Sequence, residues 1–124
     1  MPLFFVLLVG CFVGRNTSKG IVIKENDFEI ELPPGFDSIF TPDGNEFSKA
    51  RIALGEKLFF ETALSLDSTV SCASCHLPHK YFTDGLPKSR GIDDQEVDRN
   101  SPSLFNVAYH PLFLREGGVP TLEM

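Results

Sequence analysis

Two of the chain's three cysteines stand three positions apart and are followed at once by a histidine, in the stretch Cys72-Ala73-Ser74-Cys75-His76. This spacing fits three kinds of chemistry: a redox-active disulfide, a zinc site, or a covalently attached haem. The three differ in what they require of the surrounding sequence. The sequence around the motif therefore has to be used to choose among the three kinds of site.

The surroundings of the cysteines give little support to a redox pair or a zinc site. A redox-active pair normally opens a helix after a strand in a βαβ unit, and no βαβ pattern surrounds Cys72. A structural zinc site needs four ligands, usually with a second pair at finger-like spacing. No cysteine follows Cys75, so the compact set would be Cys72, Cys75, His76 and His79, which contains two adjacent ligands.

Haem attachment explains the motif as a unit. Two thiols separated by two residues add to the two vinyl groups of one porphyrin, and the next residue, a histidine, binds the iron from the proximal side. We therefore predict one covalent haem c in this chain. Cys72 and Cys75 would form the thioether bonds, and His76 would be the iron ligand.

The N-terminal segment resembles an export signal. Residues 3–13 are apolar, about half the length that a bilayer-spanning helix needs, which suits the hydrophobic part of a secretory signal. Residues 8–11, LVGC, resemble the lipobox of bacterial lipoproteins, and acylation of Cys11 would account for the odd cysteine. No Lys or Arg precedes the run, and a buried N-terminal strand or helix is the alternative. We predict a leader over residues 1–11, a periplasmic location, and a lipid anchor at Cys11.

Length and charge limit the classes of partner. A chain of 124 residues is long enough for one compact domain. The formal net charge of -6 makes a nucleic-acid backbone an unsuitable partner and favours a basic protein surface. The 12 phenylalanines could line an apolar pocket, although a Phe-rich core would explain them equally well.

The pattern along the chain predicts few regular elements. Residues 12–44 should form a tether and an irregular segment, with one short strand where residues 28–32 alternate between apolar side chains and glutamates. Ser48 is placed to cap a helix that runs to about Phe60. A membrane anchor other than the lipid is not expected from this pattern.

The second half of the chain is expected to be a long loop followed by one helix. Residues 77–100 lack a periodic pattern, and a loop of this length in a compact domain is usually functional; this one could wrap the edge of a bound cofactor. Residues 102–109 are the predicted last helix, with Ser101 as N-cap and Pro102 in its first position.

Further motifs accompany the haem motif in a fixed order: Leu54-Gly55 through Leu58-Phe59-Phe60, Phe82-Thr83-Asp84-Gly85, Arg99 through Leu104 (RNSPSL), and Gly117 through Glu123. With them, residues 45–124 resemble the N-terminal half of the bacterial di-haem cytochrome c peroxidases and their MauG-like relatives. The resemblance implies a mostly all-α, cytochrome c-like haem domain over residues 45–124, with long loops and a short N-terminal extended segment. It also implies that this domain is incomplete at its C-terminus and that the chain is a truncated product or fragment.

The resemblance also carries expectations about function. In the family, the N-terminal haem reduces hydrogen peroxide, and a C-terminal haem domain receives electrons from a small cytochrome or cupredoxin donor. Asn100 corresponds to a ligand of the calcium ion between the domains, with a simple loop hydrogen bond as the alternative interpretation. The expected partners are therefore hydrogen peroxide, the donor protein and the missing C-terminal haem domain.

Two departures from the family pattern concern the environment of the haem. Many members place a histidine that caps the resting iron about seven residues before the Arg-Asn pair, and here that position is Ile92, which cannot bind iron. We interpret His79 as a surface residue and His110 as a helix-end residue, so the distal side is expected to be open. The position of a tryptophan between the two haems corresponds to Arg115.

A third departure concerns the catalytic residues. The family's distal glutamine and glutamate would follow Met124, and Glu123 is not that glutamate, so no catalytic acid–base residue is assigned in this chain.

The alternative function is a mono-haem electron carrier without catalytic activity. Such a carrier usually has a methionine on the iron, and the two methionines are Met1 and Met124.

Overall fold

The computed structural model describes residues 19–114 and 117–120, and its first element is a β-hairpin. Strands β1 (Val22–Glu25) and β2 (Phe28–Glu31) pair antiparallel, with Ile23 opposite Ile30. The two strands are joined by a two-residue turn whose first residue, Asn26, has a φ of 50°, a left-handed conformation that asparagine tolerates in such turns. The strand predicted at residues 28–32 is thus confirmed as β2.

The long helix begins where the sequence predicts it. Helix α1 (Lys49–Phe60) has Ser48 as its N-cap, and the Ser48 hydroxyl oxygen accepts a hydrogen bond of 3.3 Å from the Arg51 backbone N–H. The cap satisfies one of the amide groups that have no partner in the first turn. None of the helix residues is buried.

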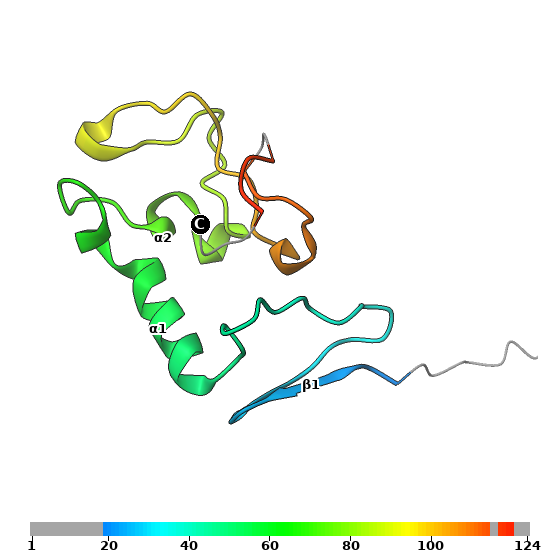
Figure 1. Cartoon of the computed structure of the whole chain (residues 1–124). Helices are drawn as coiled ribbons and strands as arrows, with labels where there is room; N and C mark the ends of the chain where they lie inside the picture. Colours follow the sequence, from blue (N-terminus) through cyan, green and yellow to red (C-terminus); the bar gives the residue numbers. More distant parts are fainter. Residues whose placement is uncertain (1–18, 115–116, 121–124) are drawn as a thin grey trace, which may run out of the picture.

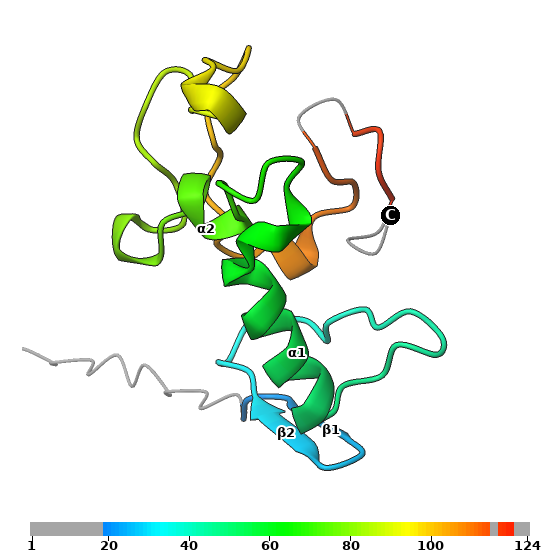
Figure 2. The same cartoon turned by 90° about the vertical axis from the view of Figure 1, so that its left-hand side faces the viewer.

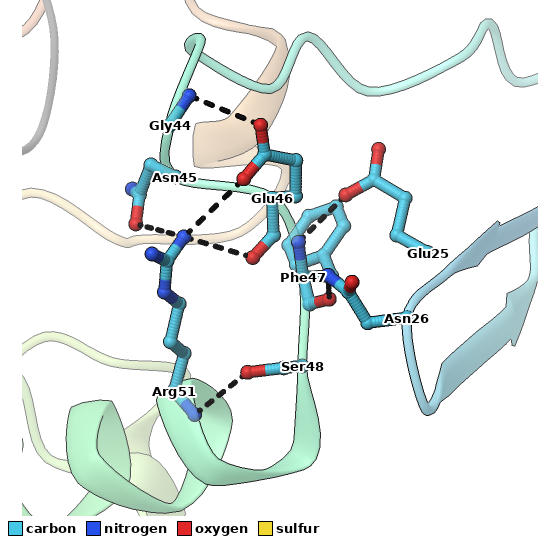
Figure 3. A network of polar contacts seen from close by, with 8 residues as sticks. All are labelled: Glu25, Asn26, Gly44, Asn45, Glu46, Phe47, Ser48 and Arg51. Atoms are coloured by element: carbon cyan, nitrogen blue, oxygen red, sulfur yellow. Dashed lines mark hydrogen bonds and ion pairs between the residues drawn. The ribbon is translucent and has the colours of Figure 1, made fainter.

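A polar network holds the hairpin against the start of α1 (Figure 3). At the end of β1, Glu25 Oε2 accepts from the Phe47 backbone N–H at 2.6 Å, and Asn26 Nδ2 donates to the Phe47 carbonyl at 2.9 Å. From the first turn of α1, Arg51 donates to the Glu46 carbonyl at 3.1 Å and lies 3.8 Å from its carboxylate. The turn of the hairpin therefore fixes the residue that precedes the helix cap.

We expect Ser48→Ala to destabilise the folded chain by about 1 kcal/mol, the usual cost of losing an N-cap side chain. The measurement is the midpoint of urea unfolding followed by circular dichroism. Ser48→Asp, which retains a capping oxygen, should behave like the parent chain. Equal midpoints for Ser48→Ala and Ser48→Asp would contradict the capping role.

The remaining elements are short. They are η1 (Thr62–Leu64), α2 (Cys72–Cys75), η2 (Pro78–Lys80), η3 (Ile92–Asp94) and η4 (Val107–Tyr109), where η denotes a turn of 3₁₀ helix. Both views show the hairpin at the N-terminal end of α1 and α2 near its C-terminal end (Figures 1 and 2). Loops occupy most of the chain after α2.

The prediction of a mostly all-α fold is wrong. Of the residues that the structure describes, 28% are helical, with the 3₁₀ turns included, and 12% are in strands or bridges; they form two α-helices and one two-stranded antiparallel sheet. The predicted helix over residues 102–109 is also wrong, because only η4 forms there and Asn106 before it has a left-handed φ of 56°. Left-handed residues likewise interrupt residues 77–100, so the predicted long loop is confirmed apart from η2 and η3.

Buried apolar side chains are few in the part of the chain that the structure describes. Ile23 and Leu32, both of the hairpin region, are the buried apolar residues among them. Many large apolar side chains after residue 50 are exposed, including Leu54 and Phe60 of α1. The described residues after the hairpin are thus arranged without an apolar core of their own.

The ends of the chain carry several predictions that the structure does not address. The predicted leader at residues 1–11, its Cys11, and Arg115 and Glu123 lie outside the described residues. Within residues 19–114 and 117–120, no helix combines the length and the apolar character that crossing a bilayer would require. The division into segments 1–11, 12–44 and 45–124 stays a prediction.

Candidate functional site

The two cysteines of the motif lie on one helical turn. They are the first and last residues of α2, and residues three apart on a helix lie on the same side. The turn is closed at its start by Ser71, whose backbone N–H donates to Ser74 Oγ at 3.0 Å. Both thiols are free, with Cys72 exposed and Cys75 half-buried. The turn therefore carries on one side two thiols that form no disulfide, and Cys75 Sγ donates to the Arg90 carbonyl at 3.5 Å.

His76 follows as the residue that ends this turn, and its ring is held by two oxygens. Nδ1 lies 2.9 Å from the Phe82 carbonyl oxygen and 3.0 Å from Ser101 Oγ. A carbonyl oxygen can only accept, so Nδ1 carries the ring proton and donates it to Phe82. Nε2 then keeps its lone pair, which is the arrangement found in metal-binding histidines. His76 is thus in the tautomer that an iron ligand needs.

Two motifs that are far apart in the sequence meet at this histidine. The Phe82-Thr83-Asp84-Gly85 motif supplies the Phe82 carbonyl, and its Thr83 hydroxyl donates to the Ser101 carbonyl at 2.6 Å. Ser101 belongs to the second motif, at residues 99–104. Within the first motif the backbone turns at Phe82, whose φ is 59°, and at Gly85, whose φ is 76°. These motifs therefore orient the imidazole.

Aromatic side chains lie beside the same segment. Phe82 is 6.2 Å from Phe59 of α1 and 6.1 Å from Phe105, measured between ring centroids, and both pairs meet edge to face. Phe59 also contacts Phe60. We call Phe59, Phe60, Phe82 and Phe105 the aromatic cluster; Phe60 and Phe105 are 54% and 55% exposed. A porphyrin is a large apolar ring system, and such side chains offer it apolar contact.

The environment of Cys75 differs from that of a redox-active cysteine. Burial raises the pKa of the Cys75 thiol, and the nearby carboxylate of Asp84 raises it further, whereas reactive CxxC cysteines have a lowered pKa. The neighbouring Ser89 hydroxyl, and then the Leu86 backbone N–H that donates to Asp84 Oδ1 at 2.9 Å, keep the pKa of Asp84 below its usual value. The Asp84 carboxylate is thus negatively charged at neutral pH and disfavours a Cys75 thiolate.

The same residues do not make a zinc site. Across the described ranges, no three or more His, Cys, Asp or Glu side chains are grouped so that they could hold a metal ion. Cys72, Cys75, His76 and His79, the one compact set that the sequence offers, are therefore not arranged as four ligands. Two free thiols on one turn, a histidine with an available Nε2, and neighbouring aromatic side chains fit a covalently attached haem.

The other predicted site residues lie elsewhere or are untested. His79 is exposed in η2, and His110, also exposed, lines a groove of about 550 Å³ together with residues 38–47. Ile92 is half-buried in η3, and Asn100 is half-buried beside Ser101. The assignment of Asn100 as a calcium ligand stays a prediction, as do the roles of Cys72, Cys75 and His76 as haem residues.

The hydrogen bonds that position the His76 ring could not be identified from the sequence. The sequence predicts Ser101 as a helix N-cap, but no helix begins at Pro102, and the Ser101 hydroxyl contacts His76 instead. The Thr83 hydroxyl that fixes the Ser101 backbone was likewise not identified. The available signal is that both residues belong to motifs that carry the family resemblance, at residues 82–85 and 99–104.

Comparison with known proteins agrees with this geometry. A family model described as di-haem cytochrome c peroxidase matches residues 49–124. The cytochrome-c peroxidase IdrP1 of Pseudomonas sp. (strain SCT) is 40% identical over 122 residues, which are 98% of this chain and 31% of the relative. The methylamine utilization protein MauG of Methylorubrum extorquens is 34% identical over 87 residues, covering 70% of this chain and 25% of MauG.

A solved structure has a similar backbone over 74% of this chain. It is the crystal structure of a MauG-like protein associated with microbial copper homeostasis, with a TM-score of 0.69 and 34% sequence identity. The alignment covers 74% of this chain and 29% of that protein. The present chain thus spans about a third or less of the length of these relatives.

Proposed function

Because the chain belongs to the di-haem cytochrome c peroxidase family, we propose that it is a haem c-binding part of an enzyme that reduces hydrogen peroxide with electrons from a small donor protein. The observation that carries the proposal is the state of His76. Its Nδ1 donates to the Phe82 carbonyl at 2.9 Å, which leaves Nε2 for the iron. The two free thiols on the preceding turn supply the attachment points.

Each group of residues at this site would have its own role in binding the haem. Cys72 and Cys75 hold the porphyrin through thioether bonds, and His76 binds the iron through Nε2. The aromatic cluster would contact apolar surface of the porphyrin and help to exclude water from it. When bound, the haem supplies the iron that exchanges electrons with peroxide. The protein contributes the ligand, its orientation and a dry environment.

The state of the distal side decides between the two candidate functions. With Ile92 where many members have a capping histidine, we propose an open distal side, which a peroxidase needs in order to bind its substrate. An electron carrier would instead have a methionine there, and Met124 is the candidate after the haem motif.

We expect the haem-loaded chain to give a high-spin ferric absorption spectrum and to bind cyanide readily. The measurement is an absorption titration of the chain produced in a host that matures c-type cytochromes. Met124→Leu is the matched control, and it should leave the spectrum unchanged. A low-spin spectrum that becomes high-spin in Met124→Leu would reject the peroxidase in favour of the electron carrier.

The remaining parts of the proposal concern partners and location. A donor of the cytochrome or cupredoxin type with a basic surface would suit the net charge of -6. We also propose a second haem domain as partner, a calcium ion near Asn100, a periplasmic location, and a lipid anchor at Cys11. The support for these is the family membership and the N-terminal sequence.

A further inference from the structure

We propose that Ser101 is a positioning residue that strengthens the bond between His76 and the haem iron by giving the imidazole a second hydrogen-bond acceptor. The proposal rests on the haem-binding function proposed above. It concerns a contact that spans 25 positions of the sequence and gives the Ser101 hydroxyl a role other than helix capping.

The argument begins with the hydrogen atom on Nδ1. The Phe82 carbonyl at 2.9 Å can only accept, so this hydrogen is present and points to the oxygens around it. Ser101 Oγ lies 3.0 Å from the same nitrogen and must therefore act as an acceptor too. The two oxygens share one N–H in a three-centre bond, an arrangement that occurs in folded proteins.

The position of Ser101 is fixed by its surroundings. Ser101 is only 6% exposed, so its side chain is largely shielded from water. The Thr83 hydroxyl donates to the Ser101 carbonyl at 2.6 Å, and Thr83 directly follows Phe82. Both acceptors of the His76 proton thus belong to one connected unit, which holds the ring plane and the two oxygens together.

The consequence for the iron follows from the charge on the ring. Acceptors at Nδ1 draw the proton away from the ring, which raises the basicity of Nε2 as a ligand. A more basic imidazole favours ferric over ferrous iron and makes a stiffer Fe–N bond. Removing one of the two acceptors should therefore raise the reduction potential and lower the Fe–His stretching frequency.

The test compares three variants of the haem-loaded chain. Ser101→Ala removes the acceptor, Ser101→Thr keeps a hydroxyl, and Ser103→Ala removes a matched hydroxyl from the same segment. The Ser103 hydroxyl donates to the Tyr81 carbonyl at 2.7 Å and accepts from the Phe105 backbone N–H at 3.3 Å, so its hydrogen bonds lie beside Phe82 and not at His76. The readouts are the Fe–His stretching band in the resonance Raman spectrum of the ferrous protein and the midpoint potential.

We expect Ser101→Ala to lower the Fe–His frequency and to shift the ferric–ferrous equilibrium toward ferrous by about tenfold, which corresponds to about 59 mV for one electron. Ser101→Thr and Ser103→Ala should keep the parent values. Parent values in Ser101→Ala, or an equal shift in Ser103→Ala, would overturn the proposal.

A second variant covers the case in which Ser101→Ala does not mature. Ser101→Cys preserves the shape of the side chain and replaces the oxygen by a weaker acceptor, so it should shift both readouts in the same direction by a smaller amount. No shift in Ser101→Cys would overturn the proposal as well. A parent chain without any haem would instead reject the proposed function, so the two failures can be told apart.

Discussion

Replacing both cysteines of the motif, Cys72→Ala with Cys75→Ala, is expected to abolish covalent haem attachment completely. The reason is that thioether bonds form only at cysteine sulfurs, and the described part of the chain has these two, both free and on one helical turn. The measurement is haem staining after a denaturing gel together with the intact mass. The parent chain should retain haem on the gel, and the double variant should show neither stain nor added mass.

The third cysteine and the single variants provide the controls. Cys11→Ser should leave haem attachment intact, because Cys11 is far from the motif in sequence and is predicted to be lipidated. Cys72→Ala and Cys75→Ala alone should each retain one thioether bond at reduced yield. Covalent haem in the double variant would show that the motif has been misassigned, and a colourless parent chain from a maturing host would reject the haem altogether.

The local features of the chain were predictable because they depend on neighbouring residues. Ser48 caps α1, and the alternation at residues 28–32 corresponds to β2, since a cap and a strand face are set by side chains within a few positions. The haem motif is equally local, because its five residues are spaced to fit the edge of one porphyrin. These signals required no knowledge of the rest of the fold.

The parts that could not be predicted depend on contacts between distant residues. Ser101 has the sequence context of an N-cap, followed by Pro102, yet its hydroxyl contacts a histidine 25 positions earlier and no helix starts there. The resemblance predicts a mostly all-α class, and this prediction is wrong because long stretches after α2 turn at left-handed residues such as Tyr81 and Phe82. Local propensity does not report such turns when neither residue is a glycine.

The second large effect is expected when His76 is replaced by glycine, because the haem then loses its proximal ligand. In His76→Gly the thioether bonds to Cys72 and Cys75 remain, so the haem should stay attached while its proximal ligand is lost. The Fe–His stretching band of the ferrous protein should disappear, and the ferric absorption maximum should move. Any peroxide turnover by the parent chain should fall to the level of free haem, because the axial ligand sets the reactivity of the iron.

Added imidazole should restore much of the iron–ligand stretching band that is lost in His76→Gly. Such a restoration would show that the band was lost because the ligand is missing and not because the chain is misfolded. The Phe82 carbonyl and Ser101 Oγ would still be present to accept the N–H of the added ring, as they do for His76. Rescue should therefore be weaker when Ser101→Ala is combined with His76→Gly. His79→Ala and His110→Ala are the matched controls, since both histidines are exposed and should leave the Fe–His band unchanged. Loss of the band in either control, or its survival in His76→Gly, would assign the proximal ligand to another residue.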